Sequence, residues 1–273
     1  MATLNLWQRF GDWARRREAL IEGFRAHKPD VAGFAESIKT GEYDQVADLL
    51  GAEFHAAHSN TRDSNGMGIS IASRWPIRQI QELDLNVTSR TAGFPCATLI
   101  AQILAPEPLG PFLFVNHFPN FQLNMEYERE LQTIAAARAI EERAPEQKEQ
   151  VVMVGDMDAD PEAASMRFWR GRQSLGGMSV CYRDAWESTH ANDPGATFTP
   201  ENPLVRQQII KGTRPFRDWP FRRIDYVLVR LGPHGGNAFD IVNCERIFAD
   251  AANGAWASDH FGLIADLRKP QTP

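Results

Sequence analysis

Acidic and histidine side chains stand at the ends of several apolar runs in this chain. The apolar run at 151–154 passes directly into Gly155, Asp156, Met157 and Asp158. Residues two apart in an extended backbone point to the same side, so Asp156 and Asp158 are expected to project together beyond a buried strand. Two like charges so placed are costly unless a cation lies between them, and oxygen ligands suit a hard ion such as Mg²⁺. The alternative is an exposed turn with two solvated acids.

A histidine and two further carboxylates occur near the C-terminal end of the sequence. Asp259 and His260 precede an apolar run at 261–267, and Asp225 lies at the start of another. A histidine that transfers protons near neutral pH benefits from a carboxylate that fixes its tautomer. Asp225 is expected to play that part, whereas the neighbouring Asp259 diverges from His260 and is free to face a metal ion. The alternative for such an acid and histidine is a surface hydrogen bond.

Two more candidates end apolar runs in the same manner. Glu36 follows the run at 31–35, and His117 follows the run at 112–116. Each has an ordinary alternative, because Glu36 could be solvated at a strand end and His117 could be a packed, hydrogen-bonded ring. Neither residue identifies a function by itself.

The elements that must position these residues are short apolar strands alternating with amphipathic helices. One helix is capped by Asp12 and ends before His27, and the helix after Asp160 is expected to use that residue as its cap, with Pro161 in the first turn. The other predicted helices cover 44–50 and 126–143, and the last covers 161–170. Strands are predicted at 31–35, 68–72, 95–104, 112–115, 151–154, 224–229 and 262–267. This mixture favours an α/β or α+β class.

Composition limits the remaining choices. The chain has 273 residues, of which 43% are hydrophobic and 23% charged, and it contains no repeat, linker or long apolar segment. A single domain over 1–273 is expected, without membrane insertion. Three scattered cysteines and no signal pattern favour the cytoplasm. A net charge of −6 weakens the case for a duplex-DNA enzyme without excluding it.

The order of these motifs carries more information than any one of them. The series comprises Asn5 in an N-terminal strand, Glu36, the segment 66–77, Asn116-His117, the segment 155–158, the segment 223–226 and the segment 258–260. It resembles the endonuclease/exonuclease/phosphatase superfamily, from Asn5 to about Leu267, and is most similar to compact bacterial members of unassigned substrate. The resemblance implies an α/β fold, namely a four-layer αββα sandwich of two mixed β-sheets flanked by helices.

The resemblance also implies a metal side of the site. Glu36 is similar to the principal Mg²⁺ ligand of the family, Asn5 lies beside it, and Asp259 completes the acidic side. Mg²⁺ is the expected ion, with Mn²⁺ as the alternative, and the resemblance leaves one ion or two undecided.

Proton transfer is assigned in the same way. Asp156 resembles the acid that orients or deprotonates the attacking water, and His260 paired with Asp225 resembles the second proton-handling group. His117 resembles the histidine that stabilises the transition state or helps the leaving oxygen. Asp158 departs from the family, in which most members have asparagine, and its extra charge is expected to strengthen metal binding or to tolerate Mn²⁺.

The expected function is therefore metal-dependent hydrolysis of a phosphate ester by a phosphodiesterase or phosphatase. A nuclease using Mg²⁺ or Mn²⁺ is the alternative, and a binding protein on the same scaffold is a second. Basic residues before Asp225 are assigned to the substrate, which could be a nucleotide or nucleic acid; they are Arg214, Arg217 and Arg222. An equal alternative is a surface loop with solvated arginines. No protein partner is predicted.

Overall fold

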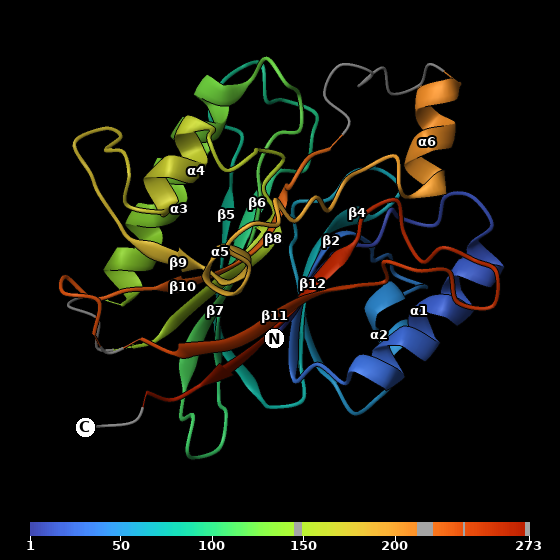
Figure 1. The fold of residues 1–273 in the computed structure, drawn as a ribbon, viewed down its shortest axis with the longest axis horizontal. Coiled ribbons are helices and arrows are strands. Elements are labelled where there is room, and N and C mark those ends of the chain that lie inside the picture. Colours follow the sequence, from blue (N-terminus) through green and yellow to red (C-terminus); the bar gives the residue numbers. More distant parts are fainter. Residues whose placement is uncertain (145–148, 212–220, 237, 271–273) are drawn as a thin grey trace.

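Two six-stranded sheets form the centre of the molecule in a computed structural model (Figure 1). The structure describes residues 1–144, 149–211, 221–236 and 238–270. No helix within these ranges combines the length and apolarity needed to cross a membrane.

The first sheet is mixed, with one parallel pair among antiparallel neighbours. Its strands, in spatial order, are β11 (Asp240–Ile247), β12 (Gly262–Arg268), β1 (Ala2–Asn5), β2 (Val31–Ile38), β4 (Met67–Ser73) and β3 (His55–His58). The parallel pair is β1 with β2, and helix α1 (Trp13–His27) makes the crossover that such a pair requires.

The second sheet repeats this plan. Its strands, in spatial order, are β5 (Ile77–Asp84), β6 (Ala97–Ile103), β7 (Phe112–Phe118), β8 (Val151–Asp156), β10 (Asp225–Arg230) and β9 (Tyr182–Asp184). The parallel pair is β7 with β8, and helix α3 (Glu126–Arg143) connects them. Each sheet therefore has one parallel pair bridged by one helix.

Helices cover the outer faces of both sheets (Figure 1). Helix α1 and helix α2 (Gln45–Leu50) pack on the first sheet, whereas α3 and α4 (Ala164–Trp169) pack on the second. Two further helices follow, α5 (Ala185–Thr189) and α6 (Pro203–Ile210). The predicted four-layer αββα sandwich of two mixed sheets is confirmed.

The hydrophobic core is layered in the same way. Between the sheets, side chains such as Ile71 and Leu99 form one buried cluster. Ile100 and Val115 point instead toward α3 and α4, and Phe34 points toward α1. Neighbouring strand residues thus serve different layers, which explains why the central strands are apolar on both faces.

Several predicted elements need correction. Strand β7 continues to Phe118, so His117 lies inside a strand instead of after it. Helix α4 begins at Ala164, because Pro161 lies in a turn closed by the Ala163 amide donating to the Asp160 carbonyl oxygen. The Asp160 carboxylate does not cap this helix; it accepts a hydrogen bond from Arg222 at 3.2 Å.

Gly155 lies where the parallel strands β7 and β8 approach each other. Its φ is +149°, and a Cβ placed there would lie 2.0 Å from the backbone oxygen of His117. Backbone atoms cannot move aside as a side-chain end can, so only glycine fits. This contact fixes the spacing between His117 and Asp156.

We expect Gly155→Ala to destabilise the fold by about 3 kcal/mol or more, because the new methyl group meets strand backbone. Urea unfolding would measure the loss. Gly177→Ala is the matched control, since Gly177 also has a positive φ of +74° but no atom lies within 4 Å of the place that a Cβ would take. That variant should lose only about 1 kcal/mol of stability, because its new Cβ strains the left-handed backbone. Equal losses in the two variants would refute the close-approach explanation.

Candidate functional site

The candidate site is assembled at the ends of the two parallel pairs. Asn5 ends β1 and pairs in register with Ala35, so Glu36 lies one residue beyond it on the neighbouring strand. His117 and Asp156 lie at the corresponding ends of β7 and β8. Because carboxyl ends of parallel strands share one edge of a sheet, the two sheets bring four polar residues to a common edge.

Glu36 occupies an irregularity in β2. The β2–β4 register shifts between Phe34 and Ser37, and Glu36 has a φ of +52°. A bulge of this kind redirects a side chain out of the regular alternation of the strand. The half-buried Glu36 carboxylate then accepts hydrogen bonds from Asn5 Nδ2 at 3.2 Å and from Gln8 Nε2 at 3.3 Å.

Asn5 connects the two sheets through its amide. Besides Glu36, its Nδ2 donates to Asp156 Oδ2 at 2.9 Å, while its Oδ1 accepts from the Trp7 amide at 2.8 Å. One side chain thereby holds a carboxylate from each sheet. In this arrangement Asn5 positions the acids, and it would present an oxygen to an ion only after a half-turn of its amide.

His260 pairs with Asp225, as the sequence suggested. The His260 Nδ1 atom lies 3.0 Å from Asp225 Oδ2 and 3.8 Å from Asp156 Oδ2. Asp225 faces Asp156 directly across the antiparallel β10–β8 pair. The ring of Phe198 packs against the imidazole, with 5.0 Å between ring centroids.

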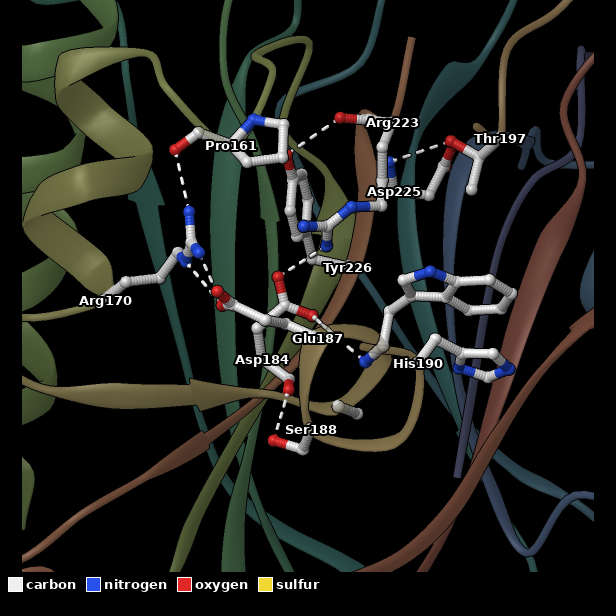
Figure 2. A network of polar contacts seen from close by, with 12 residues as sticks. Pro161, Arg170, Asp184, Glu187, Ser188, His190, Thr197, Arg223, Asp225 and Tyr226 are labelled. Atoms are coloured by element: carbon white, nitrogen blue, oxygen red, sulfur yellow. Dashed lines mark hydrogen bonds and ion pairs between the residues drawn. The ribbon is translucent and has the colours of Figure 1, made fainter. Parts of the chain in front are cut away.

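Thr197 forms hydrogen bonds to the chain beside both members of this pair, and Figure 2 shows its contact with Asp225. Its buried hydroxyl oxygen accepts from the backbone amides of Ile224 and Asp225, each at 3.2 Å. Its carbonyl oxygen accepts from the amide of Phe261, the residue after His260, at 2.8 Å. A single threonine therefore links the chain segments that carry the acid and the imidazole.

A buried ionic network lies beside the start of β10, the strand that carries Asp225 (Figure 2). The Arg223 guanidinium pairs with Asp184 and lies 4.9 Å from the centre of the Tyr226 ring. The Tyr226 hydroxyl contacts two carbonyl oxygens, those of Arg223 and Ala159, at 2.8 Å each. The loop after β8 and the start of β10 are thus joined beside Asp225.

Asp158 is buried, but its backbone is not extended as the sequence predicted. The chain turns after Asp156, and Asp158 has a φ of +49° instead of an extended conformation. Its amide donates to Asp156 Oδ1 at 3.2 Å, and its carbonyl oxygen accepts from Arg222 at 2.9 Å. Asp and Asn both tolerate this left-handed region, which accounts for either residue at this position.

Asp259 lies in the segment that leads into β12 of the first sheet. It is almost fully buried, and its Oδ2 accepts from Gln208 of α6 at 3.0 Å. The preceding Ser258 donates to the Asn5 carbonyl oxygen at 2.7 Å, which anchors this segment to β1. The negative charge of Asp259 reaches Glu36, where it contributes to a raised pKa.

His117 is a fully enclosed neutral imidazole. Its Nδ1 lies 2.7 Å from the Thr98 hydroxyl, and its buried Nε2 has no hydrogen-bond partner among the described residues. Burial lowers the pKa of His117 to about 3. If the Thr98 hydroxyl donates to Nδ1, the ring carries its proton on Nε2 and can donate there.

The electrostatics of the site are dominated by crowded carboxylates. Burial, followed by the charges of Asp158 and Asp225, raises the pKa of Asp156 well above its ordinary value. Burial followed by the charge of Asp259 raises the pKa of Glu36. Burial alone would lower the pKa of His260, but the neighbouring carboxylates outweigh it and raise that pKa well above its ordinary value.

These acids fit a divalent cation. Ligand atoms of Asp156, Asp225 and His260 lie within 4.8 Å of one another. This group differs from the predicted metal side of Asn5, Glu36 and Asp259. We favour the predicted side for the ion, because His260 is already held by Asp225 and because oxygen ligands suit Mg²⁺ better than imidazole does.

The structure describes only one of the three arginines that were predicted to bind substrate. Arg214 and Arg217 lie outside the described residues. Arg222 is 3% exposed and its guanidinium contacts Asp160 and the Asp158 carbonyl oxygen, so these contacts support the turn that carries Asp158. Its assignment to substrate stays a prediction.

Sequence reasoning missed the supporting polar residues, namely Gln8, Thr98, Thr197, Gln208 and Ser258 in its role as a donor. Apart from Ser258, which belongs to the predicted segment 258–260, none of them ends an apolar run or belongs to an acid–histidine pattern. The only signal available for Thr197 was its place at the start of the basic segment before Asp225.

The fold and this acid- and histidine-rich edge define an αββα sandwich with a polar site at the strand ends. The model of the Endonuclease/Exonuclease/phosphatase family matches residues 2–260. The chain belongs to this family. No curated protein matches it.

Solved structures show the same fold at low identity. D. rerio TDP2 in complex with a single-strand DNA product has 17% identity and a TM-score of 0.72, with 98% of each chain covered. The human Nocturnin catalytic domain with bound sulfate has 14% identity and a TM-score of 0.72, with 99% of this chain and 94% of that chain covered. An endonuclease/exonuclease/phosphatase from Bacteroides vulgatus has 15% identity, a TM-score of 0.70 and 98% coverage of both chains.

The buried His117 predicts acid sensitivity. Its pKa falls from 6.5 to about 3 on folding, so the unfolded chain binds the proton first and stability is lost as pH falls below 6.5. Between pH 6.5 and about pH 4.5 this single ring should account for about 2 kcal/mol of the loss. His117→Asn, which keeps a polar partner for Thr98, should lose correspondingly less stability across that pH range, as measured by urea unfolding. His234→Asn, at an exposed position, should follow the parent; equal acid sensitivity in both variants would contradict the assignment.

Proposed function

We propose that this protein is a metal-dependent hydrolase of phosphate esters, acting as a phosphodiesterase or phosphatase. The observation that carries the proposal is the Asn5 amide, which joins Glu36 of one sheet to Asp156 of the other beside the His260–Asp225 pair. Such a cluster has the parts that phosphate ester hydrolysis needs, namely a cation site, a carboxylate for water and an imidazole.

The cation would be held on the side of Glu36 and Asp259, with Asn5 beside them. When bound, Mg²⁺ or Mn²⁺ would neutralise the negative charge of the substrate oxygens. The raised pKa of Glu36 supports this assignment, because a cation would relieve the repulsion between Glu36 and Asp259. Metal titration of the intact protein would count the ions, one or two.

The chain's own residues would handle the protons. His260 holds its Nδ1 against Asp225, which leaves Nε2 as the nitrogen that can meet the phosphate group. Asp156 lies next to this pair and would orient the attacking water with its carboxylate. His117 stays a proposed stabiliser of the transition state; its ring is neutral, and its buried Nε2 would have to become exposed before it could donate to a phosphate oxygen.

Two observations support phosphate esters as the substrate class. The family name covers nucleases and phosphatases, and D. rerio TDP2 was solved with a single-strand DNA product. A nuclease is therefore the second candidate, although the net charge of −6 is unfavourable for binding long duplexes. The free thiols of Cys96, Cys181 and Cys244 suit the reducing cytoplasm that we propose as its location.

The test is hydrolysis of bis-p-nitrophenyl phosphate with Mg²⁺ or Mn²⁺, measured before and after chelation by EDTA. We expect metal-dependent turnover that falls about 100- to 10,000-fold in His260→Ala, the range for loss of an acid–base group. His234→Ala removes an exposed histidine and should retain full activity. Turnover that survives both EDTA and His260→Ala would overturn the proposal, and the absence of turnover in the parent would favour a binding protein. Plasmid, single-stranded DNA, RNA and a phosphomonoester panel then separate nuclease from phosphatase.

Asp158→Asn tests the one departure from the family pattern. Removing this charge takes away one of the repulsions that raise the pKa of Asp156 and reduces the negative potential that attracts a cation. We expect about ten-fold more Mg²⁺ to be needed for half-maximal activity. Asp250→Asn, an exposed acid outside the site, is the charge-matched control and should leave the metal requirement unchanged. An unchanged requirement in Asp158→Asn as well would show that Asp158 does not act on the ion.

A further inference from the structure

A groove of about 350 Å³ lies next to the candidate site, on the side of the loop that follows β1. Its lining combines two amides with three aromatic rings and one guanidinium, contributed by Gln8, Asn65, Phe10, Trp13, Tyr43 and Arg9. Gln8 belongs to both places, because its Nε2 donates to Glu36 at 3.3 Å. An ester bound at Glu36 would therefore lie next to this groove.

The groove presents flat faces to solvent. Phe10 is 48% exposed, and the Arg9 guanidinium carbon lies 4.7 Å from the centre of the Tyr43 ring. The Tyr43 hydroxyl donates to Asp48 at 2.9 Å, which fixes the orientation of the ring. A planar, electron-rich group could stack on these faces without rearranging them.

The side of the groove that carries the Gln8 and Asn65 amides is preorganised by hydrogen bonds within the protein. Trp7 and Gln8 both have left-handed backbones, with φ values of +51° and +48°, and the Gln8 carbonyl oxygen accepts from the buried Gln45 amide at 2.9 Å. The Gln8 side chain is held at both ends, because Asn65 Nδ2 donates to its Oε1 at 3.0 Å and Glu36 accepts from its Nε2. Consecutive left-handed residues cost free energy, and such strain gathers at functional positions.

We propose that this groove binds an aromatic base attached to the scissile phosphate, so that the substrate is a nucleotide-type ester. The inference rests on the proposed function and specifies its substrate class. Gln8 Nε2 and Asn65 Nδ2 each have two N–H groups, and the hydrogen bonds above use one of each. An acyl chain would cover the remaining N–H groups without satisfying them. A bare sugar would leave the Phe10 face exposed, whereas a base offers both a ring face for stacking and edge groups for the amides. A volume of about 350 Å³ is enough for one such group.

The test compares the binding of adenosine monophosphate and ribose 5-phosphate to the intact protein by calorimetry, with Ca²⁺ in place of Mg²⁺ to limit turnover. We expect the base to increase the affinity at least about ten-fold, as one stacked base does. Phe10→Leu, which keeps an apolar side chain but removes the ring, and Arg9→Ala should each lose most of this advantage, while Phe10→Trp should keep it.

Arg74→Ala is the matched control. Arg74 lies over the Phe54 ring at 4.8 Å, almost the geometry of Arg9 over Tyr43, but next to the strand ends of the first sheet that lie away from Glu36. This variant should keep the full preference for the nucleotide. Equal binding of the two phosphates by the parent, or an unchanged preference in Phe10→Leu, would overturn the inference.

The two proposals can fail separately. Turnover of bis-p-nitrophenyl phosphate without any preference for the nucleotide would leave the proposed function standing and overturn the groove assignment. A preference that depends on Phe10, in a protein that hydrolyses no ester, would support the groove as a nucleotide-binding site and overturn the hydrolase.

Discussion

Repulsion among carboxylates is the constraint on which the rest of this structure depends. Asp156, Asp158, Asp225 and Asp259 are all buried, and Glu36 is partly buried beside them. Removing such charges from water is costly, and bringing them together adds to the cost. Asn5, Gln8 and Gln208 donate hydrogen bonds to these acids, and the His260 imidazole pairs with Asp225, but the acids outnumber the positive charges beside them. The site is therefore built for a further positive partner.

The scaffold withstands this repulsion by fixing the backbone instead of the side chains alone. Each sheet contributes one parallel pair closed by a helix, and Gly155 sets a close contact in the second sheet that no other residue allows. Thr197 joins the segment of Asp225 to the segment of His260 across the two sheets. These links engage backbone groups within the buried interior, so the acids cannot separate without breaking the fold.

Much of this architecture was predictable, and the failures have a common cause. The central strands were recognised because they are buried on both faces and read as apolar runs. All four strands that were missed, β3, β5, β9 and β11, are the outermost strands of the two sheets. An edge strand pairs on one side only and is more exposed, as in the mostly half-exposed β5, so its residues carry no continuous apolar signal.

Four of the predicted site residues come together in the structure, but their local geometry was not predicted. Glu36, Asp156, Asp225 and His260 adjoin apolar runs, and the structure brings them together. The bulge at Glu36 and the left-handed turn at Asp158 depend on partners distant in the chain, which a local pattern does not contain. The same reason explains Asp160, whose partner Arg222 replaced the expected role as a helix cap.

The position of β1 has a consequence for when the candidate site is completed as the chain is made. Strand β1 lies between β2 and β12, so Asn5 meets Glu36 early, while Asp259 and His260 belong to the last strand connection described. A chain still being synthesised on the ribosome would hold one half of the site for most of its elongation. The candidate site would then be completed only when the final strand inserts beside the first.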